Sequence, residues 1–482
     1  MPLHSTRPHS DAEAPDARLA VRPQFASPGM SNVPRNRLPA GEMDAATAHQ
    51  IVHDELMLDG NARLNLATFV TTWMDEHAAR LIAECADKNI IDKDEYPQTA
   101  ELERRCVAML ADLWHAPEAG AAVGCSTTGS SEACMLAGMA LLRRWRARRG
   151  AGGMPDGHPN LVMGANVQVC WEKFCRYWDV EARLVPCSLD ATHLTADGAV
   201  AHCDEQTIGV VAVLGSTFDG SFEPVADIAD ALDRLNVERG LDVPVHVDAA
   251  SGGFVAPFLD PDLVWDFRLR RVQSINASGH KYGLVYPGVG WALWRDEAAL
   301  PDELVFHVDY LGGDMPTFAL NFSRPGAQVV AQYYTMLRLG FEGYRRVQQS
   351  CRDTARRLAA AVAAMPPFEL LSDGSDLPVL AFRRVERLAR APVGAGGTTA
   401  GGGTRDWTVY DVADALRMRG WLVPAYPMPP AIDDVAVLRI VVRNGFGPDL
   451  ASLLIDDLGR VVKALEAGGV GGTDEGRSAF HH

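Results

Sequence analysis

Residues 245–254 read VHVDAASGGF, a short apolar run rich in β-branched residues that ends in Asp248 and passes into small residues. Two further runs of this kind, Ile208–Leu214 and Val289–Trp294, lie before and after it in the chain. Amphipathic stretches such as Asp227–Asn236 separate the runs. Strands that are buried on both faces and alternate with helices are typical of a mostly parallel sheet wrapped by helices. The sequence therefore predicts an α/β fold.

The composition is that of a globular protein with a large core, since 47% of the 482 residues are hydrophobic and 22% are charged. The formal net charge of −17 disfavours nucleic acid and acidic membrane surfaces as partners, because like charges repel. Nine cysteines are dispersed without a CxxC pair or zinc-like spacing, so we predict a reducing compartment and no metal site. No apolar stretch has the length of a membrane span or a signal peptide, which predicts a cytoplasmic protein.

Composition and periodicity divide the chain into several parts. We expect a partly flexible N-terminal arm and helix at 1–60, a large α/β domain at 61–330, a smaller C-terminal α+β domain at 331–466 with a flexible loop at 391–404, and a flexible tail at 467–482.

Local patterns support these divisions. Apolar residues recur at helical spacing over Ala45–Leu58, which predicts a helix there. In the smaller domain, Val379–Phe382 and Val437–Val442 are strand-like, and a helix is expected around Val409–Arg419.

A segment of small residues, SINASGHKYG (274–283), surrounds one lysine, Lys281, with His280 directly before it. A lysine that forms an imine with a cofactor carbonyl must be unprotonated part of the time, and burial supplies this by disfavouring the ammonium form. Taken alone, the segment is equally consistent with a surface lysine in a turn.

Asp248 is predicted to lie at the carboxyl end of a buried strand, where ligands bind in open parallel sheets. A carboxylate at that position can keep a pyridine nitrogen protonated, which makes the ring an electron sink. The alternative is an Asp that caps a following helix.

Upstream, TTGSSEA (127–133) precedes a long helical run, Cys134–Arg149. Ser130 and Ser131 stand at the start of that helix, where free backbone N–H groups and the helix dipole favour a phosphate. The motif is weak by itself. The combination of the three motifs is more specific. It predicts pyridoxal 5′-phosphate as the cofactor, because a phosphate cradle, an Asp for a ring nitrogen and a His-Lys pair follow one another in that order on one α/β scaffold.

These motifs resemble the glutamate decarboxylases, a family of group II pyridoxal-phosphate decarboxylases with the aspartate-aminotransferase fold (fold type I). The resemblance runs from about Asp54 to Phe446. It includes DELMLDGNARLNLATFVTTW (54–73), DKDEYPQT (92–99), GSSEACMLAG (129–138), NVQVCWEKF (166–174), NFSRPGAQVVAQYY (321–334) and VLRIVVR (437–443). It implies decarboxylation of L-glutamate to 4-aminobutanoate and CO2, with Lys281 as the cofactor lysine.

By position, the resemblance also implies roles for individual residues. The cofactor phosphate is expected to contact Ser130, Ser131, His280 and, from the neighbouring subunit, Ser323. The cofactor ring is expected to contact Gln168 on its face, Thr217 on its O3′ side and Asp248 at N1. Arg439 is expected to bind the substrate α-carboxylate. The distal carboxylate is expected to lie against Thr68, Phe69, Asn89 and Asp92, partly across a dimer.

Each role has a simpler alternative. Arg439 is also consistent with a surface residue, Asn89 and Asp92 with ordinary turn residues, and Gln168 with the cap of a hydrogen bond in the core. The aromatic residues spaced at helical intervals are expected to belong to the core rather than to contact the cofactor: Trp171, Phe174, Tyr177 and Trp178.

Two other functions stay open. One is a different lyase on the same scaffold, acting on aspartate, an aromatic amino acid or a phosphorylated sphingoid base; the lack of an apolar membrane helix counts against the last. The other is a non-enzymatic phosphate-binding module.

The site shared between subunits implies a homo-oligomer of at least two chains, with a hexamer as an open alternative. No calmodulin partner is expected, because residues 466–482 lack Trp and a basic amphipathic face. Some bacterial relatives carry a His near the C-terminus that enters the site at neutral pH, and the resemblance implies the same role for His481 or His482. The simpler alternative is a disordered end.

Overall fold

The computed structural model describes residues 35–118, 123–153, 157–308, 315–385 and 407–468. The chain divides into two compact units, Met1–Asn61 and Ala62–His482. The described part of the first unit contains one helix, α1 (Ala45–Leu56). This confirms the predicted helix to within two residues. It begins after Asp44, whose carboxylate accepts a hydrogen bond from the Thr47 backbone N–H at 3.1 Å.

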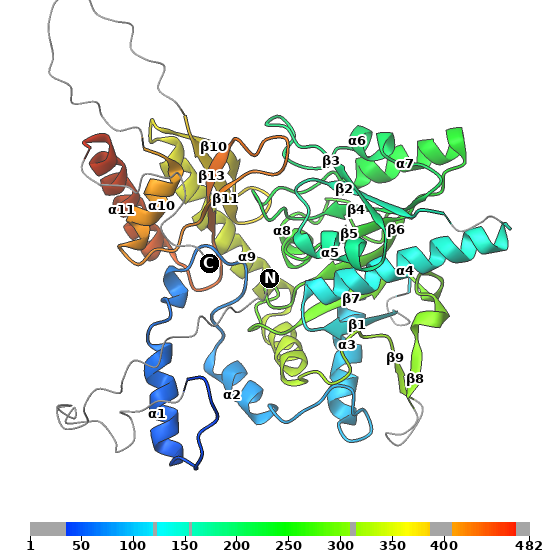
Figure 1. Cartoon of the computed structure of the whole chain (residues 1–482), viewed down its shortest axis with the longest axis horizontal. Coiled ribbons are helices and arrows are strands. Elements are labelled where there is room, and N and C mark those ends of the chain that lie inside the picture. Colours follow the sequence, from blue (N-terminus) through cyan, green and yellow to red (C-terminus); the bar gives the residue numbers. More distant parts are fainter. Residues whose placement is uncertain (1–34, 119–122, 154–156, 309–314, 386–406, 469–482) are drawn as a thin grey trace, which may run out of the picture. The chain divides into compact units, whose positions relative to one another are not determined.

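The second unit is built on a seven-stranded sheet with the strand order β1-β7-β6-β5-β4-β2-β3 (Figure 1). Strands β6, β5, β4, β2 and β3 are parallel, and β7 runs antiparallel to both of its neighbours, β6 and β1. The predicted mostly parallel sheet is therefore confirmed. The strand bounds are β1 Val123–Thr127, β2 Asn160–Gly164, β3 Glu181–Val185, β4 Thr207–Val213, β5 Val245–Asp248, β6 Val272–Ala277 and β7 Gly290–Trp294.

The strand directions bring distant segments to one edge of the sheet. Because β1 and β6 are both antiparallel to β7, they point the same way, and so do all the parallel strands. The carboxyl ends of six strands therefore share an edge, and the segments that leave β1, β2, β4, β5 and β6 meet there. In open α/β sheets this edge binds ligands.

Helices cover the sheet. Helix α4 (Ser130–Ala151), which follows β1, packs against β4, β6 and β7, and α3 (Pro97–Leu113) packs against β1. The apolar positions on α4 are buried with those on α5 (Val169–Tyr177) in one cluster, which hides this face of the sheet from water. The remaining helices before β7 are α2 Glu76–Glu84, α6 Ala196–Ala201, α7 Val225–Arg239 and α8 Ala256–Leu259.

A smaller antiparallel sheet follows, with the order β10-β11-β13-β12. Its strands and helices bury a separate apolar cluster that includes Phe382 and Leu438. Helix α9 leads into it and bends at Gly340, whose φ of 56° interrupts the helical geometry. The bounds are α9 Ala327–Ala363, β10 Phe368–Asp373, β11 Val379–Arg384, α10 Val409–Arg417, β12 Ala425–Pro427, β13 Ala436–Val441 and α11 Pro448–Glu466.

The strands and the helix predicted for this smaller module are confirmed in β11, β13 and α10. The domain boundary near 330 stays a prediction, since it falls within α9. The predicted loop 391–404 and residues 469–482 of the predicted tail, including His481 and His482, lie outside the described residues. A short antiparallel ribbon, β8 (Phe306–Val308) with β9 (Met315–Thr317), completes the sheets. In the described ranges, no helix combines the length and apolar character that crossing a bilayer requires.

Candidate active site

A cavity of about 290 Å³ lies at the shared edge of the large sheet. Its walls come from five segments that follow β1, β2, β4, β5 and β6. The residues that line it are Thr128, Gly129, Ser130, Ser131, Glu132, Asn166, Gln168, Cys170, Val213, Gly215, Thr217, Asp248, Ala250, Ser278, His280 and Lys281. Every residue that the sequence predicted to contact the cofactor from the same chain lies in this wall.

Lys281 lies in the turn that follows β6. Its Nζ donates a hydrogen bond to Ser251 Oγ at 3.2 Å and lies 5.2 Å from the centroid of the Phe69 ring. Burial lowers the pKa of Lys281; the nearby Asp248 carboxylate opposes this shift, and the Arg439 cation adds to it. A surface lysine in a turn is therefore the wrong reading of this segment. The amine is held in a wall where it is more readily deprotonated, as a nucleophile requires.

Asp248 ends β5 and is only 4% exposed. Its Oδ1 accepts hydrogen bonds from Asn276 Nδ2 at 3.0 Å and from the Ala250 backbone N–H at 3.1 Å. Its Oδ2 accepts one from Trp171 Nε1 at 2.8 Å. Asp248 does not cap a helix, because Ser251 occupies the N-cap of the short helix that follows. Hydrogen bonds from N–H groups favour the ionised form of a buried carboxylate.

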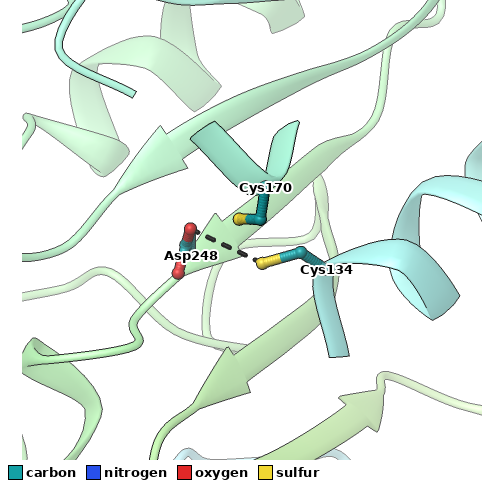
Figure 2. Close-up of side chains that lie close together, drawn as sticks. All are labelled: Cys134, Cys170 and Asp248. Atoms are coloured by element: carbon teal, nitrogen blue, oxygen red, sulfur yellow. Dashed lines mark hydrogen bonds between the residues drawn. The ribbon is translucent and has the colours of Figure 1, made fainter. Parts of the chain in front are cut away.

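Two thiols accompany this carboxylate. Cys134 on α4 and Cys170 on α5 each place a sulfur near Asp248, with the ligand-type atoms of all three residues within 4.8 Å of one another (Figure 2). The Cys134 sulfur lies 3.6 Å from Asp248 Oδ2. Burial raises the pKa of Cys134 well above its usual range, so it remains a thiol. Since metal binding requires a thiolate, we interpret Cys134 as a weak S–H donor to the carboxylate.

The opposite wall is suited to a phosphate. Helix α4 begins after Gly129 without a side-chain cap, so the N–H groups of its first turn are available to an anion. Ser130 Oγ lies 2.6 Å from Ser278 Oγ, and the two hydroxyls are buried together. The exposed Ser131 lies beside them in the cavity wall.

His280 contributes a neutral donor to this wall. Its Nδ1 accepts from the backbone N–H groups of Gly288 and Val289, at 3.4 and 3.3 Å, so the ring proton is on Nε2. Burial lowers the pKa of His280 to about 4, and the adjacent Lys281 contributes. The imidazole is therefore neutral at neutral pH and can donate one hydrogen bond from Nε2.

Arg439 is buried, with 8% of its surface exposed, and is not the surface arginine of the alternative reading. Its guanidinium donates to the backbone carbonyls of Thr217 and Ala67. It lies 4.8 Å from the centroid of the Phe69 ring and 5.3 Å from that of Tyr426. Phe69 therefore contacts both Lys281 and Arg439.

Thr68 precedes Phe69 in a turn in which its hydroxyl accepts from the Val70 backbone N–H at 3.0 Å. Thr71 ties this turn to the segment that carries Lys281, because its N–H and hydroxyl donate to the backbone carbonyls of His280 and Lys281, at 2.7 and 2.6 Å. Thr68 itself does not line the cavity, and its contact with a substrate stays a prediction.

Asn89, Asp92 and Ser323 form a cluster of their own. Asn89 Nδ2 donates to Asp92 Oδ2 at 3.0 Å and to Ser323 Oγ at 3.2 Å, and Asn89 Oδ1 accepts from the Arg324 backbone N–H at 3.1 Å. Ser323 is exposed. None of the three lines the cavity of the same chain. The structure thus brings these predicted residues together, but apart from Lys281.

Gln168 has a local role as well as a place in the wall. It is the N-cap of α5, where its Oε1 accepts from the Cys170 backbone N–H at 2.6 Å. This capping bond resembles the simpler alternative proposed for it from the sequence. The contact of Gln168 with the face of a cofactor ring stays a prediction.

The aromatic residues of α5 divide between the core and the surface. Trp171 and Phe174 are fully buried and Trp178 packs against the same cluster, as predicted. Tyr177 is 63% exposed, so its assignment to the core was wrong. Tyr177 lies on the solvent-exposed face of the helix. Trp171 also donates a hydrogen bond to Asp248, a contact that the sequence did not indicate.

Sequence reasoning missed four further residues of the site. Ser278 and Asn166 line the cavity. They lie in the segments SINASGHKYG and NVQVCWEKF, but a small polar residue in a loop indicates no particular role by itself. Glu132 accepts from the backbone N–H groups of Leu320 and Asn321, which ties the segment before Ser323 to α4. Arg443 donates to the carbonyls of Val70 and Asn65 and so fixes the turn that carries Phe69. Arg443 lies in VLRIVVR, two residues after the end of the buried strand β13, and a charged residue at that position could have indicated a role in the site.

The site fits pyridoxal 5′-phosphate. Lys281, with its lowered pKa, could hold the aldehyde, and the buried Asp248 carboxylate with its fixed donors could hold the ring nitrogen. The uncapped N-terminus of α4, beside the neutral imidazole of His280, could hold the phosphate. The fold and this set of groups define a pyridoxal-phosphate enzyme of fold type I.

The chain belongs to the pyridoxal-dependent decarboxylases: residues 39–385 match the pyridoxal-dependent decarboxylase conserved domain. A glutamate decarboxylase of Aliivibrio fischeri is 50% identical over 486 residues and covers all of both chains. Glutamate decarboxylase 5 of Arabidopsis thaliana is 50% identical over 90% of this chain and 85% of that protein.

Solved structures agree with this assignment. A glutamate decarboxylase of Lactobacillus brevis, 46% identical, superimposes with a TM-score of 0.84 over 90% of this chain and 96% of that one. A sphingosine-1-phosphate lyase of Burkholderia pseudomallei, with a TM-score of 0.73, is only 23% identical and shows the fold alone.

The approach of α4 to His280 gives a prediction about phosphate binding. A Cβ added at Gly129 would lie 2.8 Å from His280 Cε1, closer than real Cβ contacts, so Gly129→Ala displaces the imidazole. We expect the dissociation constant of pyridoxal phosphate to rise about 10-fold or more, equivalent to about 1.4 kcal/mol. Equilibrium titration of the apoenzyme, followed by absorbance, measures this. Gly150→Ala on the same helix is the matched control, since nothing lies within 4 Å of its Cβ. Equal affinities for the two variants would contradict the phosphate assignment.

Proposed function

We propose that this chain catalyses the pyridoxal-phosphate-dependent decarboxylation of L-glutamate to 4-aminobutanoate and CO2. The observation that carries the proposal is that Lys281 and Arg439 share one aromatic ring, that of Phe69, at 5.2 and 4.8 Å from its centroid. An amine that can react with the cofactor and a cation that can bind a carboxylate are therefore neighbours. Relatives named glutamate decarboxylases, 44–50% identical over most of the chain, support glutamate as the amino acid.

Arg439 is suited to hold the α-carboxylate. Two of its nitrogens are fixed by the backbone carbonyls of Thr217 and Ala67, and its buried Nε has no partner among the described residues. A buried donor without a partner costs free energy, which a substrate carboxylate would recover. The rings of Phe69 and Tyr426, whose centroids lie 4.8 and 5.3 Å from the guanidinium, limit its rotation, so little entropy is lost on binding.

When bound, the cofactor supplies an electron sink for the pair left at Cα as CO2 departs. The residues of the chain supply orientation and charge. Arg439 holds the carboxylate and so directs the bond that breaks, while Asp248 keeps the ring nitrogen protonated by its negative charge. Lys281, whose pKa burial lowers, gives up its proton more readily than an exposed lysine and returns one to Cα. The overall reaction consumes one proton.

We further propose that the distal carboxylate is bound across a dimer. Asn89 and Asp92 are clustered with Ser323, the residue predicted to contact the cofactor phosphate of a neighbouring subunit. None of the three lines the cavity of its own chain, which is expected if they serve the cavity of a partner. Thr68 and Phe69 would complete this pocket from the chain that carries Lys281. Selection of glutamate over an apolar amino acid follows, because an apolar side chain would leave these polar groups unpaired.

The proposed assembly is a cytoplasmic homo-oligomer of at least two chains, without calmodulin. The net charge of −17 supports the exclusion of nucleic acid and acidic membranes from its partners. The dispersed, free and mostly buried cysteines among the described residues are consistent with a reducing compartment.

The first prediction of the proposal concerns Lys281. Lys281→Ala is expected to lower the rate of CO2 release from glutamate by several orders of magnitude, because no other amine lines the cavity among the described residues. Borohydride treatment of the unmutated enzyme should fix the cofactor to the peptide that contains Lys281, as detected by mass spectrometry. Lys173→Ala, on the outer side of α5, is the control and should retain both properties. Cofactor fixed to a different peptide would overturn the assignment.

The second prediction tests the shared site. Asn89→Ala is expected to raise the KM for glutamate about 10- to 150-fold, the range for the loss of a hydrogen bond to a charged group. Lys281→Ala and Asn89→Ala chains can be unfolded together and refolded so that they pair at random. About a quarter of all sites should then contain both the native Lys281 and the native Asn89. Those sites should show the unmutated KM. A mixture that shows only the raised KM of Asn89→Ala would mean that each site is built from one chain.

A further inference from the structure

A chain of hydrogen bonds runs through the interior of the large sheet to Asp248. Ser274 Oγ lies 2.8 Å from His246 Nδ1, His246 Nε2 lies 2.7 Å from Asn276 Oδ1, and Asn276 Nδ2 lies 3.0 Å from Asp248 Oδ1. The residues alternate between the neighbouring strands β5 and β6. His246 and Asn276 are 0% exposed and Ser274 is 2% exposed, so water does not compete for these bonds.

The chemistry of the groups fixes the direction of the chain. An ionised carboxylate only accepts, so Asn276 turns its amide N–H₂ to Asp248 and its Oδ1 to His246. That oxygen also only accepts, so His246 carries its proton on Nε2 and its Nδ1 accepts from the Ser274 hydroxyl. Burial lowers the pKa of His246 to about 4, although Asp248 opposes the shift, so the ring is neutral at neutral pH. Every donor in the chain points toward Asp248.

Trp171 holds the other oxygen of the carboxylate. Its indole N–H donates to Asp248 Oδ2 at 2.8 Å, and its ring centroid lies 5.0 Å from that of His246. Trp171 is itself 0% exposed. With Oδ1 held from β6 and Oδ2 held from α5, rotation of the carboxylate would break bonds on both sides. The donors come from two separate elements, so the position of Asp248 depends on both.

We propose that Trp171, Asn276 and His246 are positioning residues that hold the Asp248 carboxylate ionised and in one orientation toward the ring nitrogen of the cofactor. None of them needs to touch the cofactor, because each acts through Asp248. The inference rests on the proposed function, since decarboxylation depends on a protonated ring nitrogen. It adds residues to the site that lie inside strands and in the core, where packing alone would otherwise explain them.

Trp171→Phe is the direct test, because it keeps an aromatic ring and removes the N–H. The holoenzyme is reloaded with pyridoxal phosphate labelled with ¹⁵N in the ring, and the ¹⁵N resonance reports the protonation of that nitrogen. We expect the resonance to move toward the unprotonated position. We also expect kcat for glutamate to fall about 10-fold or more, as for the loss of a hydrogen bond to a charged group, with a much smaller change in KM.

Trp421→Phe is the matched control. Trp421 also donates from a buried indole to a carboxylate, Asp457 Oδ2, at 2.9 Å, but this pair belongs to the smaller antiparallel sheet and its helices. Its removal should leave the ¹⁵N resonance and kcat unchanged. If Trp171→Phe does not fold, Asn276→Ala interrupts the chain on the Oδ1 side, and the same shift of the resonance is expected.

Two results would overturn the inference. One is a fall in kcat with an unmoved ¹⁵N resonance, which would make Trp171 a packing residue only. The other is no change in either quantity. Because the resonance requires bound cofactor but no substrate, it tests the positioning role even if glutamate proves to be the wrong amino acid. If the unmutated enzyme turned over no amino acid, but Trp171→Phe still moved the ¹⁵N resonance as expected, only the proposed function would be contradicted.

Discussion

The site depends on one buried negative charge, the carboxylate of Asp248. A charge that is only 4% exposed costs several kcal/mol unless it is neutralised or well hydrogen-bonded. The chain meets this cost with N–H groups from three places: the indole of Trp171, the amide of Asn276 and the backbone of Ala250. Since these donors are uncharged, the carboxylate keeps its negative charge available to the cofactor. A salt bridge at this position would have cancelled that charge.

The topology explains how the other groups reach the same cavity. All parallel strands point the same way, and β7, antiparallel to β6 and β1, returns β1 to the common direction. The start of α4 therefore lies beside the ends of β5 and β6, although it is more than a hundred residues earlier in the sequence. The antiparallel strand is thus a requirement of the site, because it places the N-terminus of α4 at the same sheet edge as Asp248. Arg443 and Thr71 then hold the turn that carries Phe69 against Lys281.

The sequence predicted the parts of the site that stand at strand ends. Asp248, His280 and Lys281 are polar residues among small ones directly after apolar runs, and such patterns indicate the binding edge of a parallel sheet. Ser130 and Ser131 were recognisable because a helix follows them. These signals are local, so they survive without knowledge of the tertiary structure.

The supporting residues could not be predicted in this way. Trp171 has the spacing of a core aromatic residue, and its partner Asp248 lies 77 positions away. His246 and Asn276 are polar residues inside buried strands, and only the register of β5 against β6 shows that they meet. Tyr177 has the same helical spacing as its buried neighbours but faces solvent, because spacing alone does not set the phase of a helix. Likewise, only the distances in the structure show that Asn89, Asp92 and Ser323 form one cluster.

The proposed reaction of this cavity is removal of the α-carboxylate of glutamate. Its most direct test is to incubate the cofactor-loaded protein separately with each common amino acid, using glutamate labelled with ¹³C at the α-carboxylate, and to identify the products. We expect ¹³CO2 and unlabelled 4-aminobutanoate in equal amounts from glutamate, and little amine from glutamine or the aromatic amino acids. Comparable amine from an aromatic amino acid, or recovery of the glutamate with its label intact, would contradict it.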